Sequence, residues 1–293
     1  MRTAPLVVAL VLATTSAFAQ DGSMPPGPAL PPPAMDAPSS TAALDAALAP
    51  VLAGSWRSQA NRARDSYRHP RETLGFFGVR PDQTVIEIWP GGGWYAEVLA
   101  PMLQANGHYI GVMPAPAGSD SSRASTTRNN DKLRASFAAR PDLFSNGKLI
   151  EADPAAPVLG PDNSADVVLT FRNAHNWVMA DRQAQMFKAM FAVLKPGGTL
   201  GVVDHRARAD QPAAEMKSSG YLPEAYVIKL AEDAGFVIED KSEVNANPRD
   251  TKDYPEGVWT LPPTLTLGEK DREKYKAIGE SDRMTLRFIK PAG

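Results

Sequence analysis

From residue 70 onward the chain alternates between short apolar runs, rich in β-branched residues, and segments with apolar residues at helical spacing. The apolar runs predict strands at 84–89, 109–113, 148–151, 166–172 and 199–204. Strands that alternate with helices are typical of a parallel sheet covered by helices. The pattern therefore predicts an α/β fold.

Helices are predicted at 95–104, 182–194 and 223–234, where apolar residues recur on one side. We expect these apolar stripes to face the core. Two late strands are predicted at 236–244 and 284–290, and no ordinary crossover helix joins them. An antiparallel pair of strands permits such a connection.

Two polar segments lie outside this alternation. Residues 245–283 contain four prolines, and an ordered insertion of that length is more often functional than decorative. Residues 62–69 carry three arginines before Pro70. The simplest interpretation of that cluster is a solvated helix face; the alternative is a lid whose arginines face an anionic group.

The first residues have the layout of a secretory signal peptide. A positively charged start precedes an apolar run at 5–14, which is too short to span a bilayer, and Ala17-Phe18-Ala19 has the small-x-small pattern of a cleavage site. We predict a signal peptide at 1–19, with an uncleaved anchor as the alternative. The prediction implies an exported protein of the bacterial cell envelope, located in the periplasm.

The proline-dense stretch that follows predicts a linker rather than a folded element. We assign residues 20–45 to a disordered, proline-rich linker and residues 46–293 to one domain, which includes the insertion at about 245–283. With 43% hydrophobic residues in 293, the chain can bury a full core.

Composition excludes several functions. The chain has no cysteine, so a thiol nucleophile, an iron–sulfur site and a cysteine zinc site are excluded. A formal net charge of −2 gives no support to a nucleic-acid partner. We expect a small-molecule substrate, no nucleic acid and no membrane-spanning segment once the signal is removed.

One predicted strand leads directly into a glycine cluster. Glu87 lies in the strand at 84–89, and Gly91, Gly92 and Gly93 follow it. Glycines let the backbone approach a ligand where a side chain would collide, and the acid can accept hydrogen bonds from hydroxyl or amino groups. A strand that ends in such a turn usually holds an adenosine-containing cofactor.

With its elements in this order, the chain resembles the class I S-adenosylmethionine-dependent methyltransferases. The resemblance rests on the loop after Glu87, on the turn at Leu194-Lys195-Pro196-Gly197-Gly198 and on Ala234-Gly235-Phe236. More narrowly, residues 87–95, 170–177 and 204–207 resemble motifs of a group of exported predicted methyltransferases. The resemblance implies a Rossmann-like three-layer sandwich whose seven-stranded, mostly parallel sheet has an antiparallel last strand.

The resemblance also implies a cofactor, S-adenosylmethionine, at the carboxyl ends of the strands. It assigns cofactor-binding positions to Glu87, Trp89, Gly91, Gly92, Gly93, Asp153, Phe171 and Arg172. Glu87 and the glycines would hold the methionyl part, and Asp153 the adenine amino group.

Two residues depart from the family pattern. Trp89 stands at the first glycine of the loop, and Met113-Pro114 replaces the acid that binds the ribose hydroxyls. Either another group holds the ribose, or the site is altered or empty.

Histidines follow the fourth and fifth strands, where they should face one cleft. We predict that His175 is the general base, oriented by Asp204 or Asn173, and that His205 lines the acceptor pocket with Arg206. Each histidine could instead be a hydrogen-bonded packing residue. A metal site that adds His69 has no supporting ligand spacing, so we predict no metal.

Two rival functions remain open. Residues 91–96 also fit G-x-G-x-x-A, which is typical of NAD-dependent oxidoreductases, but Met113 stands where their ribose-binding acid is expected. A non-methylating ligand-binding protein on the same fold is the stronger rival, since fold does not determine activity and an exported enzyme lacks an obvious supply of a cytoplasmic cofactor. The sequence favours a methyltransferase with an unidentified acceptor.

Overall fold

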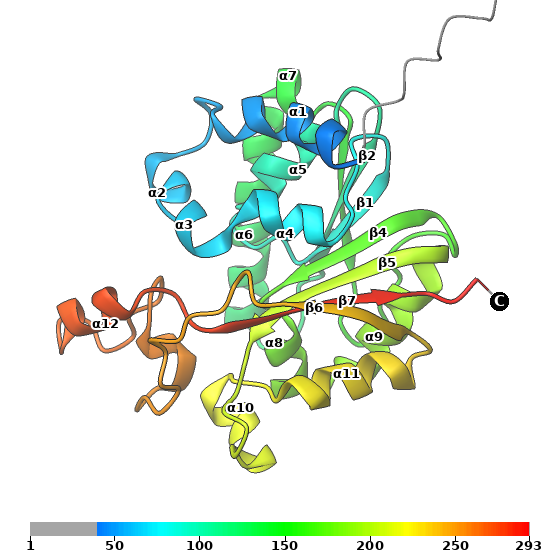
Figure 1. Ribbon diagram of the computed structural model, residues 1–293. Coiled ribbons are helices and arrows are strands. Elements are labelled where there is room, and N and C mark those ends of the chain that lie inside the picture. Colours follow the sequence, from blue (N-terminus) through cyan, green and yellow to red (C-terminus); the bar gives the residue numbers. More distant parts are fainter. Residues whose placement is uncertain (1–39, 293) are drawn as a thin grey trace, which may run out of the picture. The chain divides into compact units, whose positions relative to one another are not determined.

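Figure 1 shows the computed structural model of the chain, and the structure describes residues 40–292. The predicted signal peptide at 1–19 and the linker up to residue 39 lie outside the described residues. Helix α1 (Ser40–Leu52) takes in the remainder of the stretch assigned to the linker. It folds because Leu44 and Leu48 are buried against the rest of the domain.

The sheet has seven strands in the order β3-β2-β1-β4-β5-β7-β6, and β7 runs antiparallel to both of its neighbours. The strands are β1 (Thr84–Ile88), β2 (His108–Pro114), β3 (Gly147–Ala152), β4 (Ala165–Phe171), β5 (Leu194–His205), β6 (Val237–Ser242) and β7 (Arg283–Ile289). Every strand predicted from the apolar runs is present, and the predicted fold class is confirmed.

The central strands are buried on both faces. In β1, Ile86 and Ile88 pack into one apolar cluster and Val85 into the other, as the two-residue period of a strand requires. Glu87 shares the face of Val85 and is only 3% exposed. A charged side chain in this position needs partners.

Two groups of helices cover the sheet (Figure 1). On one face lie α1, α4 (Pro70–Phe76), α5 (Ala96–Leu103) and α7 (Pro141–Phe144); on the other lie α8 (Ala174–Met179), α9 (Gln183–Val193), α10 (Met216–Ser219) and α11 (Glu224–Asp233). The predicted stripes of α5 and α9 face the core, since Val98, Leu99, Met186 and Met190 are buried. Within residues 40–292 no helix has the length and apolar character that crossing a bilayer requires.

The direction of β7 brings the insertion to the functional edge of the sheet. His205, the last residue of β5, pairs with Arg283, the first residue of β7. Residues just before β7 therefore lie beside the carboxyl ends of the parallel strands, where open sheets bind ligands. The insertion contains η2 (Gly257–Thr260) and α12 (Arg272–Ile278).

Candidate functional site

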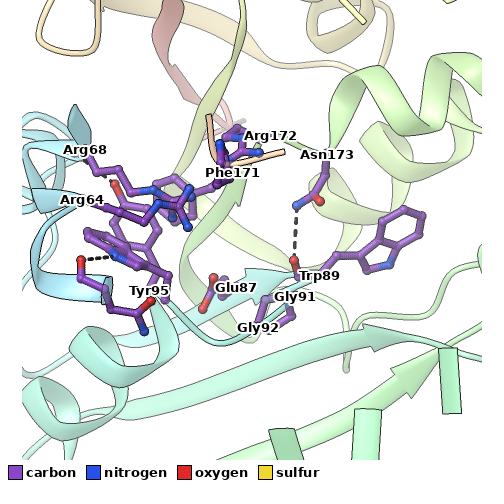
Figure 2. A pocket seen from close by; sticks show the side chains of 14 residues that line it. Arg64, Arg68, Glu87, Trp89, Gly91, Gly92, Tyr95, Phe171, Arg172 and Asn173 are labelled. Carbon is purple, nitrogen blue, oxygen red and sulfur yellow. Dashed lines mark hydrogen bonds between the residues drawn. The ribbon is translucent and has the colours of Figure 1, made fainter. Parts of the chain in front are cut away.

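A cavity of about 270 Å³ opens at the end of β1, and we call it the β1 cavity (Figure 2). Its lining includes Glu87, loop residues 89–92 and residues 171–173 at the end of β4. Arg64 and Arg68 line it from the short helices α2 (Gln59–Arg62) and α3 (Asp65–Arg68) and the turn between them. The sheet edge, the glycine loop and the amino-terminal segment thus meet around one space.

The glycine loop is shaped to leave room for a ligand. A Cβ added to Gly91 or Gly92 would meet no atom within 4 Å, so both backbones border open space. Gly93 has a φ of +83°, and a Cβ there would come within 2.9 Å of Leu133 on α6 (Asp120–Ala138). Gly91 and Gly92 therefore serve the cavity, whereas Gly93 serves helix packing and a left-handed turn.

Glu87 presents a partly satisfied carboxylate to the β1 cavity. The Tyr109 hydroxyl donates to its Oε2 at 2.7 Å, and no described residue donates to Oε1. Burial raises the pKa of Glu87 to about 7, although the Tyr109 hydrogen bond and Arg68 act in the opposite direction. A cationic ligand group such as an ammonium would stabilise the ionised form.

Trp89 keeps the backbone path of a glycine. Its φ is +50°, in the left-handed region that costs an ordinary residue about 1–2 kcal/mol. Its N–H donates to the Val112 carbonyl at 2.7 Å, and its ring lies edge-on to Trp177 with centroids 5.7 Å apart. The loop therefore retains its shape although the first glycine is absent.

The end of β2 offers no carboxylate to a ligand. Met113 is buried and lines a second cavity of about 190 Å³, the β2 cavity, together with Thr126 and Asn129 on α6. Glu151, which pairs with Met113 across the strands, is engaged by Asn130 at 2.9 Å and by Arg134 at 2.6 Å. Any ribose contact in this cavity would come from amide and hydroxyl groups.

The remaining residues assigned to the cofactor divide into two groups. Phe171 stacks on Tyr95 at 3.5 Å between centroids and lines the β1 cavity, as does Arg172. Asp153 is exposed and its Oδ1 accepts the Ala155 N–H at 2.8 Å. It lines none of the cavities described here, so the structure does not bring Asp153 to the others.

The predicted base and its orienting acid are in direct contact. His175, on α8, donates from Nδ1 to Asp204 Oδ1 at 2.8 Å, because a carboxylate can only accept. The second oxygen of Asp204 accepts the His175 backbone N–H at 3.2 Å. The proton on Nδ1 leaves Nε2 as the basic nitrogen, and no described residue binds it.

His205 lies against this pair. Its ring centroid is 4.8 Å from that of His175, and its Nδ1 is 2.6 Å from Ser281 Oγ. Burial, the adjacent His175 and nearby arginines hold the pKa of His205 well below its usual range, so this ring is neutral. Both rings line a third cavity of about 160 Å³, the histidine cavity, with Trp259.

The donor atoms of His175, Asp204 and His205 lie within 4.8 Å of one another, close enough to hold a metal ion. In the structure the Asp204 carboxylate is used within the chain: Oδ1 also accepts the His205 backbone N–H at 2.7 Å. His69 is not part of this group. The side chains of His175 and Asp204 thus form a hydrogen-bonded pair, and no described residue bonds Nε2 of His175.

Asn173 makes no hydrogen bond to His175, and Arg206 does not line the histidine cavity. Asn173 donates to the Ile88 carbonyl at 2.8 Å and to Thr170 Oγ1 at 3.2 Å, which ties the end of β4 to that of β1. Arg206, expected in the acceptor pocket, instead binds the Glu243 carboxylate at 2.7 Å. Of the two candidates for orienting His175, Asp204 is the one in contact.

Sequence reasoning left two interpretations of the arginines at 62–69 open, a solvated helix face and a lid that faces an anionic group. The prediction of a solvated helix face is wrong for Arg68, which is 8% exposed, and for Arg64, which lines the cavity; Arg62 is exposed. Glu280, in the insertion, is the carboxylate partner of Arg64 and of Arg68. The available signal was two arginines one helical turn apart before a proline, which is weak by itself.

Comparison with known proteins agrees with this geometry. Residues 86–202 match the family profile described as a methyltransferase domain. The [4+2]-cyclase SpnF is 18% identical over 88% of this chain and 98% of its own, with a TM-score of 0.54. A geranyl diphosphate methyltransferase in complex with SAM is 13% identical over 82% of this chain and 94% of its own, with a TM-score of 0.51. These two structures show a shared fold, and a search of curated proteins finds no match.

The β1 cavity fits the methionyl part of S-adenosylmethionine, the cofactor of this family. Gly91 and Gly92 leave the space that a ligand would fill, Glu87 has a free carboxylate oxygen for an ammonium, and arginines are present for a carboxylate. The family match, the strand order and this fit show that the chain contains a class I S-adenosylmethionine-dependent methyltransferase domain.

Proposed function

We propose that the chain is a methyltransferase that methylates an oxygen or nitrogen of a small-molecule acceptor, with His175 as the general base. The observation that carries this proposal is the Asp204–His175 pair: no described residue bonds Nε2 of His175, and His175 lines a cavity next to the cofactor cavity. Arg172 lines both cavities, so the two are neighbours.

Each part of the site has a distinct task. Glu87 and Gly91 would hold the methionyl part of the cofactor, which would supply an electrophilic methyl group on a sulfonium. His175 accepts the acceptor's proton at Nε2 while Asp204 keeps Nδ1 protonated and stabilises the imidazolium that forms. His205 stays neutral, so it does not repel that imidazolium.

Cofactor binding is tested by thermal shift of the purified chain with S-adenosylmethionine, S-adenosylhomocysteine and NAD. A ligand at a hundredfold its dissociation constant adds about 2.7 kcal/mol to the free energy of unfolding. We expect a shift with both adenosyl ligands and none with NAD. Absence of a shift with either adenosyl ligand at millimolar concentration would remove the basis of the proposal.

The role of His175 is tested by His175→Gln with His108→Gln as the matched control, because His108 is exposed and lies at the start of β2. We expect His175→Gln to bind S-adenosylhomocysteine normally and to lose about 10²–10⁴-fold in turnover of an identified acceptor. The control should match the parent in S-adenosylhomocysteine binding and in turnover. If His175→Gln abolishes cofactor binding as well, the residue is structural.

A non-methylating protein on this fold is the second candidate. Trp89 in a glycine conformation and Met113 in place of an acid favour it, as does the fold shared with a [4+2]-cyclase. It predicts that S-adenosylhomocysteine binds without any methyl transfer when acceptors are screened with methyl-labelled cofactor.

We also propose that the protein acts in the cell envelope, on the basis of the charged, apolar and small-residue pattern of residues 1–19. Fractionation of expressing bacteria should place the chain in the periplasm with an amino terminus at Gln20. A cytoplasmic chain that still starts at Met1 would contradict this location.

A further inference from the structure

Four arginines share one carboxylate beside the β1 cavity. Glu280 is 2.6 Å from Arg64 Nε, 3.3 Å from Arg283, 3.6 Å from Arg68 and 3.9 Å from Arg172. Burial opposes ionisation of Glu280, but Arg283, Arg68 and Arg64 lower its pKa to about 2. The cluster therefore carries a large positive excess in a buried place.

Two of these guanidinium groups lack hydrogen-bond partners. Among the described residues, the side chains of Arg68 and Arg172 donate no hydrogen bond, and Arg64 Nη2 is also buried without a partner. Arg68 is more than nine-tenths buried. Besides Glu280, its guanidinium group faces the ring of Trp94, whose centroid is 4.6 Å from the guanidinium carbon. Buried donors of this kind are rarely left unpaired, so a ligand is expected to pair them.

The backbone also holds Arg172 in an unusual conformation. Its φ is +63°, in the left-handed region, and its N–H is fixed to the Val203 carbonyl at 2.7 Å. Burial lowers the pKa of Arg68 and of Arg172 to about 10, with Glu280 acting in the opposite direction, so both stay cationic at neutral pH. Strained residues of this type cluster at ligand sites.

The cofactor alone does not match this excess of charge. S-adenosylmethionine has a sulfonium, an ammonium and one carboxylate, so it is a net cation and can pair with only part of the arginine cluster. A second anion is needed for the remaining guanidinium groups. Arg172 lines both the β1 cavity and the histidine cavity, so that second anion would lie next to His175.

We propose that the guanidinium groups of Arg64, Arg68 and Arg172 that the cofactor's carboxylate leaves free form an anion subsite for the acceptor, which is therefore an acid that carries a carboxylate or phosphate group. This inference rests on the proposed function and specifies its substrate class. The arginine cluster would hold the anionic end while the group to be methylated faces His175. Guanidinium forks bind planar or tetrahedral oxyanions in two-point contacts, which also orients the ligand.

The test measures binding of inorganic phosphate and malonate to the full chain by calorimetry, with and without saturating S-adenosylhomocysteine. We expect binding of at least one anion in the presence of S-adenosylhomocysteine. Anion binding that S-adenosylhomocysteine abolishes, but that persists with 5′-methylthioadenosine, which lacks the carboxylate, would assign the arginine cluster to the cofactor's carboxylate. That result would overturn the inference. Absence of binding in all conditions would overturn it too.

A matched pair of variants shows where the anion binds. Arg64→Gln should weaken anion binding at least tenfold, and Arg62→Gln, which removes an exposed arginine from the adjacent helix, should change it less than twofold. Equal losses would indicate surface attraction. S-adenosylhomocysteine binding without anion binding refutes this inference and leaves the proposed function intact. Anion binding without S-adenosylhomocysteine binding refutes the proposed function, and the assignment of the anion to a methyl acceptor falls with it.

Discussion

Replacement of Glu87 by glutamine should make the domain more stable and its cofactor site weaker. The carboxylate is 3% exposed and its pKa rises from 4.5 to about 7, chiefly because burial disfavours the charge. Glutamine has nearly the same shape, and its amide oxygen can still accept from the Tyr109 hydroxyl. The substitution therefore removes a buried charge without removing a contact.

The size of the effect follows from linkage. Above pH 7 the folded protein holds an ionised Glu87 at a cost, because the folded pKa exceeds the unfolded one. Each pKa unit corresponds to about 1.4 kcal/mol, so Glu87→Gln should increase the free energy of unfolding by about 3 kcal/mol at pH 8.5. The gain should shrink as pH falls through 7 and vanish near pH 4, where Glu87 is neutral in both states.

Urea denaturation of parent and variant at pH 4.5, 6 and 8.5 measures this difference directly. The same samples should show weaker binding of S-adenosylhomocysteine by the variant, at least tenfold at pH 8.5, because the ammonium loses its anionic partner. A variant that is equally stable or less stable at pH 8.5 would refute the reasoning about burial. Unchanged affinity would remove Glu87 from the cofactor site.

Three further predictions concern the support of the site. In the parent, the free energy of unfolding should fall by about 1.4 kcal/mol per pH unit below pH 6.5, because the buried His205 ring takes up a proton only when the chain unfolds. The variant His205→Asn should not show this fall, and denaturation of variant and parent across pH 4.5–7.5 tests it. Arg57→Met should cost about 2–3 kcal/mol, since the buried guanidinium pairs with Asp65 at 2.7 Å, and thermal melting measures the loss. Trp89→Gly should relieve about 1 kcal/mol of backbone strain yet destabilise the domain by about 1–2 kcal/mol net through lost packing on Trp177, as urea denaturation would show.

The sheet could be predicted from sequence because its signal is local. Strands buried on both faces read as apolar β-branched runs, as in β1 and β4, and the turns between them carry glycine and proline. The proximity of His175 to Asp204 followed from topology, because β4 and β5 are parallel neighbours, His175 comes shortly after the carboxyl end of β4 and Asp204 is the penultimate residue of β5. The position of a residue at the end of a strand can thus be predicted from the sequence, although its contacts cannot.

Helix α6 and the arginine cluster could not be predicted because their determinants are not local. Helix α6 spans Asp120–Ala138 but buries only Asn130 and Leu133, so it has no apolar stripe to reveal it. The partner of Arg64 is Glu280, 216 positions away along the chain. Charged residues near a turn look the same in sequence whether they are solvated or buried, and only the tertiary partner decides.

The two departures from the family pattern differ in what they change, because Trp89 lies in the glycine loop beside the β1 cavity and Met113 lies in the β2 cavity. Trp89 holds the left-handed φ that the loop needs, so the backbone of the glycine turn still presents Gly91 and Gly92 to the β1 cavity. Met113, by contrast, leaves the β2 cavity without a carboxylate. We therefore expect cofactor affinity in this chain to depend more on the charged methionyl group than on the ribose, and the Glu87→Gln comparison tests that expectation.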